Sequence, residues 1–261
     1  MNAIEKDVKQ ECKVYNFPEV PKEEVVEKLP KRTLTGEIKK TPNNTKPNRD
    51  KINPFTEEDV KLMVKYFRNK VDTSENDSEE IINRRNLSLF VMGVNVGLRC
   101  SDIVKLKWSD IYDKDWNFLD DKEIKPQKTS NKDKHVTLNY NEAFMQAIEY
   151  YRKYKPNVDI NDYIATSRKG SYIKPDAFAE VIKKAAKDAG IKYNVCSHSM
   201  RKTFARVRYD HSDNKEETLV ELMELFNHAS TLVTLKYIGI RKDEIKRLYN
   251  KVNLGLDEMF D

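Results

Sequence analysis

Apolar side chains recur every three or four residues in many parts of this 261-residue chain, which is the spacing of one face of a helix. Met63 and Phe67 belong to one such set, and Thr56 stands before them as a residue suited to cap a helix. The pattern predicts a surface helix over about 56–69. The acidic stretch Asp72–Glu80 that follows is expected to be a loop.

The run Leu87–Val96 is apolar nearly all round, which is typical of a buried helix, and Gly97 is suited to end it. Ser101 and Asp102 can cap a short helix that runs through Lys107. The same periodicity predicts further helices at about 140–153, 175–188, 198–209, 216–226, 231–238 and 242–251.

Short apolar runs separated by charged turns lie between Trp108 and Leu138, and they predict a small antiparallel sheet. The whole pattern favours an α+β fold that is mostly helical, as one domain over 54–261. The residues before it differ in composition, because six of the nine prolines lie in the first 54 residues. We therefore expect 1–53 to be an extended, Pro-rich segment.

Part of that segment is strongly basic, since residues 28–51 hold eight Lys or Arg against two acids. A stretch of this kind can lie along the phosphates of DNA, and a solvated linker without a partner fits these residues equally well. In the first interpretation the contacts to DNA come from Lys39, Lys40, Lys46 and Arg49.

Composition narrows the class of protein. With 38% hydrophobic residues the chain can build a core, and the net charge of +5 permits nucleic-acid binding without requiring it. The sequence has no apolar run long enough to span a membrane and no secretory signal, so we expect a soluble cytoplasmic protein. The three cysteines form no CxxC pair, which argues against a disulfide framework or a cysteine-rich zinc site.

Several residues are suited to hold an anion. His198 and Arg201 are three apart at the start of an expected helix, so both can face one anion near the positive helix end. Arg99 follows the glycine after the buried helix, where its planar fork can be fixed on a phosphate. Taken singly, each has an ordinary explanation: an exposed pair for the first, and for Arg99 a salt bridge with Asp102.

Taken in order, four motifs resemble the catalytic set of the tyrosine recombinases, the phage integrase family. They are GLRCSDIVKLKWSDI, QKTSNKDKHVTL, HSMRKTFA and LFNHASTLVTLKYIGI, and the resemblance covers about residues 54–255. It implies an integrase-like catalytic domain whose catalytic residues are Arg99, Lys128, His198, Arg201, His228 and Tyr237, with Asp102 in support.

The resemblance also implies an enzyme, a site-specific DNA recombinase that forms a 3′-phosphotyrosine through Tyr237 and needs no ATP. Two arginines supply up to ten donors for the charge that develops on the phosphate. Lys128 would protonate the leaving 5′ oxygen, His198 would act as base or hydrogen-bond partner, and His228 would hold a phosphate oxygen. No acidic pair or Cys/His cluster stands ready for a metal, so we expect no metal and no other cofactor.

The implied partners are double-stranded DNA, contacted also by Lys202, and three further copies of the chain in a tetramer on two DNA sites. Accessory DNA-bending or directionality proteins are further candidate partners. A non-catalytic DNA-binding homologue and a type IB topoisomerase are the alternatives to a recombinase.

Two features depart from the family pattern. Asn227 stands where a glycine is common before the third-motif histidine. In addition, family members usually carry a helical domain of about a hundred residues before the catalytic one, whereas 53 Pro-rich residues stand here. The chain is therefore expected to be either a minimal recombinase or a fragment.

Overall fold

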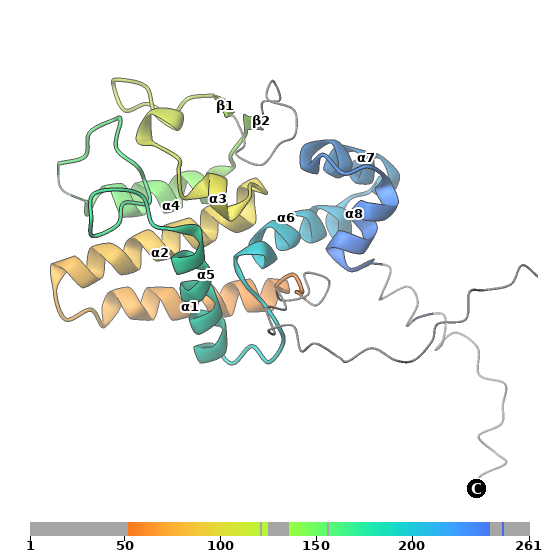
Figure 1. Cartoon of the computed structure of the whole chain (residues 1–261), viewed down its shortest axis with the longest axis horizontal. Helices are drawn as coiled ribbons and strands as arrows, with labels where there is room; N and C mark the ends of the chain where they lie inside the picture. Colours follow the sequence, from red (N-terminus) through yellow and green to blue (C-terminus); the bar gives the residue numbers. More distant parts are fainter. Residues whose placement is uncertain (1–51, 121, 125–135, 156, 241–246, 248–261) are drawn as a thin grey trace, which may run out of the picture. The chain divides into compact units, whose positions relative to one another are not determined.

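A computed structural model, shown in Figure 1, describes residues 52–120, 122–124, 136–155, 157–240 and 247. Most of these residues are helical, and the helices are α1 (Glu57–Asp72), α2 (Asp77–Val96), α3 (Cys100–Ile103), α4 (Glu142–Arg152), α5 (Pro175–Asp188), α6 (Ser197–His211), α7 (Lys215–Phe226) and α8 (Thr231–Ile238). Strands β1 (Lys122–Ile124) and β2 (Val136–Leu138) pair antiparallel. The expected mostly helical α+β fold with a small antiparallel sheet is confirmed.

Helix α1 begins as its sequence predicts. The Thr56 hydroxyl accepts a hydrogen bond from the Asp59 amide, and the Asp59 carboxylate accepts one from the Thr56 amide. Each side chain therefore pairs a backbone N–H group that has no acceptor within the helix. Met63 and Phe67 are buried on the inner face. The helix extends to Asp72, three residues beyond its predicted end.

Helix α2 begins ten residues earlier than predicted, and the expected acidic loop is partly wrong. Asn76 caps the helix by accepting from the Glu79 amide at 3.0 Å. Asp77, Glu79 and Glu80 occupy the first turn, where acidic side chains stabilise the positive end of a helix. The acids that suggested a loop thus belong to the start of a helix.

The segment after α2 needs two further corrections. Helix α3 is capped by Arg99 and spans only Cys100–Ile103, so it ends before Lys107. The stretch Trp108–Asp110 is a single 3-10 turn rather than a strand, because the Asp110 carboxylate accepts from the Lys107 amide and closes the turn. The hairpin tip after β1 and the helix predicted at 242–251 lie outside the described residues, apart from residue 247.

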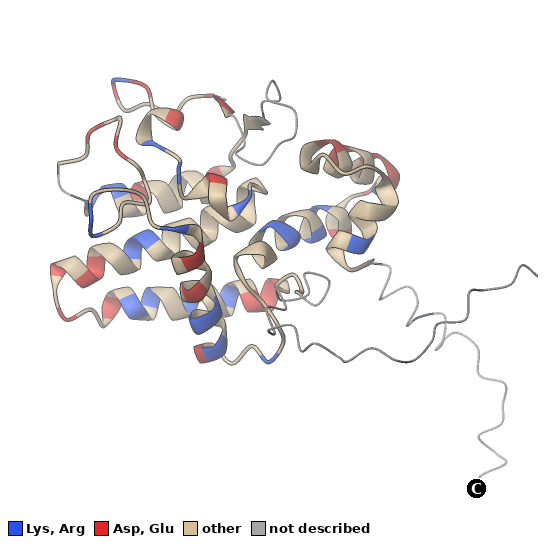
Figure 2. Ribbon diagram, viewed as in Figure 1, with Lys and Arg blue, Asp and Glu red and all other residues tan. Residues whose placement is uncertain are grey.

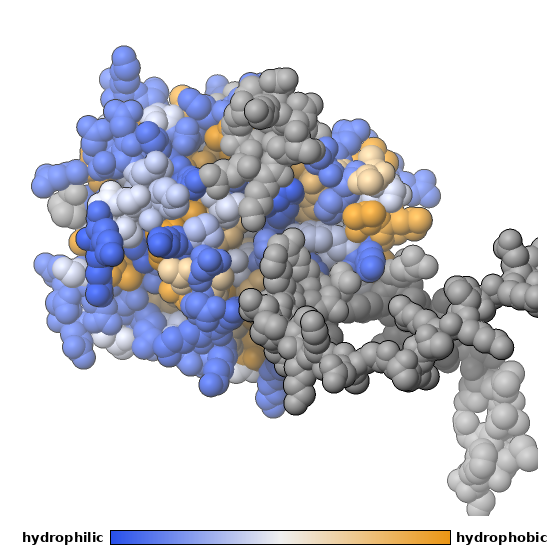
Figure 3. Space-filling view, in the orientation of Figure 1, coloured by the Kyte–Doolittle hydropathy of each residue, from blue (hydrophilic) through white to orange (hydrophobic). Residues whose placement is uncertain are grey.

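The main core surrounds α2, which packs against α1, α4 and α6. A smaller cluster joins α6, α7 and α8 through buried apolar side chains that include Phe204, Leu222, Phe226 and Ile238. On the surface, apolar side chains gather over α7 and α8 (Figure 3), where Leu232 is 61% exposed. None of the described helices is long and apolar enough to cross a membrane.

Gly93 in α2 and Gly97 directly after its last residue allow the close approach of α6. A Cβ atom at Gly93 would lie 2.6 Å from the Met200 sulfur, and one at Gly97 would lie 2.6 Å from the Phe204 ring. Gly97 also ends α2 in the left-handed conformation, with φ of 65°. A side chain at Gly97 would therefore meet both a steric and a backbone penalty.

We expect Gly97→Ala to lower the free energy of unfolding by about 2–4 kcal/mol, from the left-handed backbone and the displaced Phe204 ring together. Gly190→Ala is the matched control, because Gly190 has φ of 88° and nothing within 4 Å of its added Cβ. The control should lose only about 1 kcal/mol. Equal losses in urea unfolding of the two variants would contradict close packing at Gly97.

Candidate active site

Tyr237 lies in the last turn of α8, with its side chain partly buried. Its ring meets two aromatic neighbours edge to face: the Phe226 centroid is 5.5 Å away and the His228 centroid is 5.1 Å away. Ser230 caps α8 by accepting from the Val233 amide. The ring of Tyr237 is therefore held from one side by the end of α7 and the loop after it.

Arg201 of α6 brings a positive charge to the surroundings of Tyr237. Arg201 is 7% exposed and donates to the Gly97 carbonyl oxygen, and its charge acts to lower the pKa of the Tyr237 phenol. The guanidinium carbon also lies 3.9 Å from the centroid of the Phe226 ring, which gives a cation–π contact. Burial lowers the pKa of Arg201 to about 10, so the group stays charged at neutral pH.

Arg99 brings a second positive charge to the same site. It caps α3 with an extended backbone, directly after the turn at the end of α2. Its charge lowers the pKa of Arg201 and His228 and also acts to lower that of Tyr237, whereas the charge of Asp102 raises the pKa of Arg201. Two like charges thus share one site, and Asp102 offsets part of their repulsion.

His228 follows α7 in a tight turn. Asn227 closes the helix in the left-handed conformation, with φ of 55° and ψ of 50°, and the His228 amide donates to the Met223 carbonyl at 2.9 Å. Asparagine tolerates this conformation better than most residues, which explains why it can replace a glycine here. The His228 Nδ1 lies 3.0 Å from the Thr234 hydroxyl oxygen.

His198 lies in the first turn of α6, one turn before Arg201, and is partly buried. Cys196 caps this helix: its sulfur accepts from the His198 amide at 3.4 Å, and the Cys196 amide donates to the Ser199 hydroxyl. His198 and Arg201 thus lie three residues apart near the positive end of one helix, as predicted, and their joint contact with one anion stays a prediction.

The pKa of Tyr237 is raised. Burial is the main cause, and the charges of Arg201 and Arg99 act in the opposite direction without cancelling it. The pKa of His228 is lowered by burial first and then by the same two arginines. The site therefore holds a protonated phenol, two guanidinium ions and a neutral imidazole.

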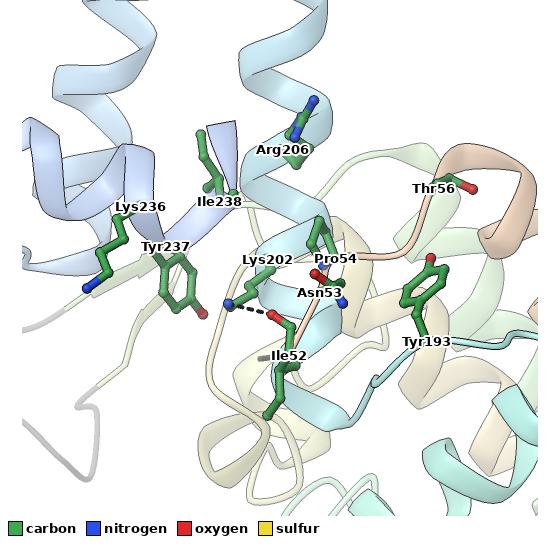
Figure 4. A pocket seen from close by; sticks show the side chains of 11 residues that line it. Ile52, Asn53, Pro54, Thr56, Tyr193, Lys202, Arg206, Lys236, Tyr237 and Ile238 are labelled. Atoms are coloured by element: carbon green, nitrogen blue, oxygen red, sulfur yellow. Dashed lines mark hydrogen bonds between the residues drawn. The ribbon is translucent and has the colours of Figure 1, made fainter. Parts of the chain in front are cut away.

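A cavity of about 230 Å³ opens beside Tyr237 (Figure 4). Lys202 of α6 lines it, donates to the Ile52 carbonyl at 2.7 Å and places its amine 5.0 Å from the centroid of the Tyr237 ring. Arg206 and Lys236 line the cavity too. Lys and Arg follow one another along α6 (Figure 2), so the surroundings of the cavity are basic.

Lys202, expected to contact DNA, is 7% exposed, and its amine already has an acceptor within the chain. The other expected contacts, Lys39, Lys40, Lys46 and Arg49, and the expected catalytic Lys128 lie outside the described residues. Among the residues that are described, no three His, Cys, Asp or Glu side chains are grouped so that they could hold a metal.

A comparison with known families decides the identity of the domain. The profile described as the phage integrase family matches residues 71–244. The chain belongs to the phage integrase family. A relative is the probable integrase/recombinase YoeC of Bacillus subtilis, 31% identical over 175 residues that cover 67% of this chain and 87% of YoeC.

Other members of the family are longer. Tyrosine recombinase XerC of Caldanaerobacter subterraneus is 26% identical over 212 residues, which cover 76% of this chain and 55% of XerC. The crystal structure of XerA recombinase matches with a TM-score of 0.55 at 19% identity, over 76% of this chain and 63% of XerA. A lambda integrase dimer bound to a COC′ core site matches with a TM-score of 0.52 at 14% identity. The match covers 73% of this chain and 49% of the lambda integrase chain. The integrase-family chain therefore shares the recombinase fold.

Sequence reasoning missed three contributors to this integrase-family site: the Gly97 carbonyl, the Phe226 ring and the Thr234 hydroxyl. Phe226 contacts Arg201, His228 and Tyr237 at once, yet in the sequence it reads as an ordinary core residue. The spacing of Thr234 could have marked it as a residue of the site, because it lies one helical turn before Tyr237 and residues three apart share a helix face.

The lowered pKa of His228 predicts a pH dependence of stability. Below its ordinary pKa of 6.5 the unfolded chain takes up a proton that the folded chain does not, so this contribution to stability is lost as the pH falls. His228→Gln should therefore lose less stability than the unaltered protein between about pH 7.5 and 5.5 in urea unfolding. An equal or larger loss in the variant would show that His228 does not titrate in this way.

Proposed function

We propose that this integrase-family protein is a site-specific recombinase that breaks and rejoins double-stranded DNA through a 3′-phosphotyrosine at Tyr237. The main support is the convergence on one phenol: the charges of Arg201 and Arg99 both act on Tyr237, and the centroid of the His228 ring lies 5.1 Å from that of Tyr237. Matched proteins add support, since their names are those of recombinases and lambda integrase is seen bound to a DNA core site.

The proposed reaction exchanges one phosphodiester for another. The Tyr237 oxygen attacks phosphorus, a bond from that oxygen to phosphorus forms, and the bond to the 5′ oxygen of the next nucleotide breaks. The phenol gives up its proton, and the leaving 5′ oxygen takes one, for which Lys128 is the proposed donor. Because the phosphodiester energy is kept in the phosphotyrosine, the reverse step reseals the strand without ATP.

The raised pKa of Tyr237 bears on the timing of proton loss. A bound phosphate brings negative charge and raises the pKa of the phenol further. We infer that the proton leaves as the attack proceeds and not before it, with His198 as the proposed acceptor or hydrogen-bond partner. Arg99 and Arg201 then stabilise the negative charge that grows on the phosphate oxygens.

We also propose that the protein works without a metal ion, because two guanidinium groups can supply the electrostatic stabilisation that a metal would give. We further propose that four copies of the chain act together as a tetramer on two DNA sites, and that they do so in the cytoplasm. DNA-bending or directionality proteins are proposed to assist them. A purely DNA-binding role is disfavoured, since a chain without catalysis has no need to keep all six chemical residues.

The first test is covalent capture of DNA. We expect the full-length protein, in excess chelator, to form a covalent complex with a nicked duplex taken from a tiled set covering the DNA beside its gene. Tyr237→Phe should abolish the complex because the attacking oxygen is gone, while gel-shift binding to the same duplex remains. Gel electrophoresis under denaturing conditions and peptide mapping measure the complex and its attachment site.

Tyr154→Phe is the matched control, because Tyr154 is 51% exposed on the segment after α4, and it should react like the unaltered protein. A complex that survives in Tyr237→Phe would refute the assignment of the nucleophile. If DNA cleavage stopped in excess chelator and returned when magnesium was added, metal-assisted hydrolysis would replace transesterification as the mechanism. Relaxation of any plasmid, without preference for a site, would favour a topoisomerase.

The arginines give a second test. Arg99→Ala and Arg201→Ala should each slow formation of the covalent complex by roughly a hundredfold or more, the loss typical when a preorganised donor to a transition-state oxyanion is removed. Arg68→Ala, at an exposed position on α1, is the control. Arg201 also supports the fold through Gly97, so melting temperatures accompany the rates. A loss below about threefold in a folded variant would make that arginine structural.

A further inference from the structure

The hydrogen bond between His228 and Thr234 has a consequence for where the imidazole carries its proton. Thr234 is fully buried, at 0% exposure, and its hydroxyl oxygen lies 3.0 Å from Nδ1 of His228. A neutral imidazole has one nitrogen that donates and one that accepts, and the partner of one nitrogen decides the role of the other. The threonine hydroxyl can take either part, so the charge of the ring and the group that its other nitrogen meets decide the outcome.

Among the described residues, the charged groups that act on His228 come from two other elements. Arg201 of α6 and Arg99 before α3 both disfavour a positive imidazole, and burial acts in the same direction. The third neighbour with a titratable group is Tyr237 of α8, whose phenol is protonated. These surroundings favour a neutral ring, which has a single proton to offer.

A neutral ring can serve an anionic substrate only with the proton on the nitrogen that meets it. An unprotonated nitrogen would direct its lone pair at a phosphate oxygen and repel it. Since Nδ1 is bound to Thr234, Nε2 on the opposite edge of the ring is the nitrogen left for the substrate. The useful tautomer therefore has the proton on Nε2 and an accepting Nδ1.

We propose that Thr234 is a positioning residue whose hydroxyl donates to Nδ1 of His228, so that the neutral ring presents Nε2–H to the phosphate. The proposal rests on the function proposed above. Thr234 also ties the ring to α8, one helical turn before Tyr237. The helix that carries the proposed nucleophile therefore also sets the orientation of His228.

Histidine NMR tests the tautomer directly, without cleavage. The full-length protein is labelled with 15N-histidine, and two-bond correlations distinguish the two neutral tautomers, with His228→Gln identifying the signal. At pH 8 we expect the Nε2–H form in the unaltered protein and in Thr234→Ser. In Thr234→Val the Nδ1–H form should become populated, because the donor to Nδ1 is gone. An Nδ1–H tautomer in the unaltered protein would overturn the proposal.

Covalent capture at several pH values provides the second readout. At pH 8, Thr234→Val should slow formation of the complex about tenfold, the order expected for loss of one oriented hydrogen bond. As the pH falls and the imidazole gains a second proton, both nitrogens become donors, so the ratio of the two rates should shrink. Thr234→Ser should stay within about threefold of the unaltered protein, because it keeps the hydroxyl.

Thr231→Val is the matched control on the same helix and should leave the rate unchanged at every pH. A defect in Thr234→Val that is independent of pH would mean that Thr234 only packs, and would refute the proposal. If no duplex is captured at all, the proposed function fails, whereas the tautomer measured by NMR still decides the part of Thr234.

Discussion

The close contact of α2 and α6 is the constraint on which the site depends. Gly93 and Gly97 leave room on α2 for two side chains of α6, and the Gly97 carbonyl accepts a hydrogen bond from Arg201. Because Gly97 can adopt a left-handed backbone, the chain turns there and delivers Arg99 two residues later. One glycine thus brings together two arginines that are far apart in the sequence.

Holding two guanidinium groups in a partly buried site costs free energy, and the structure shows what offsets it. Arg201 has a carbonyl acceptor, the face of Phe226 and the charge of Asp102. These contacts compensate for burial only in part, since the pKa of Arg201 is still lowered. The repulsion between Arg201 and Arg99 therefore remains, and in the proposed function a bound phosphate would relieve it.

The sequence predicted those features that are coded locally. The cap at Thr56, the end of α2 at Gly97 and most helix positions follow from neighbouring residues, and all of them are confirmed. Features that depend on tertiary contacts were missed. The 3-10 turn after Lys107 is also held by distant residues, because the Trp108 amide donates to the Asp162 carbonyl, and the role of Phe226 arises only when α6 and α8 meet beside it. The motifs predicted the candidate residues, but they did not predict that the Gly97 carbonyl and the Phe226 ring contact Arg201.

The site divides into two halves that differ in how they are attached. Arg99 and Arg201 are attached where α2 meets α6, because Arg99 follows Gly97 by two residues and Arg201 donates to the Gly97 carbonyl. Tyr237 and Thr234, the partner of His228, lie on α8, and within the described part of the chain the buried apolar side chain of α8 belongs to the smaller cluster. Helix α8 is eight residues long and ends in a left-handed glycine. Elements with little buried apolar contact are the ones that open locally at the least cost. Any such movement of α8 carries Tyr237 and Thr234 together, and with Thr234 the ring of His228, while Arg201 stays bound to the Gly97 carbonyl after α2.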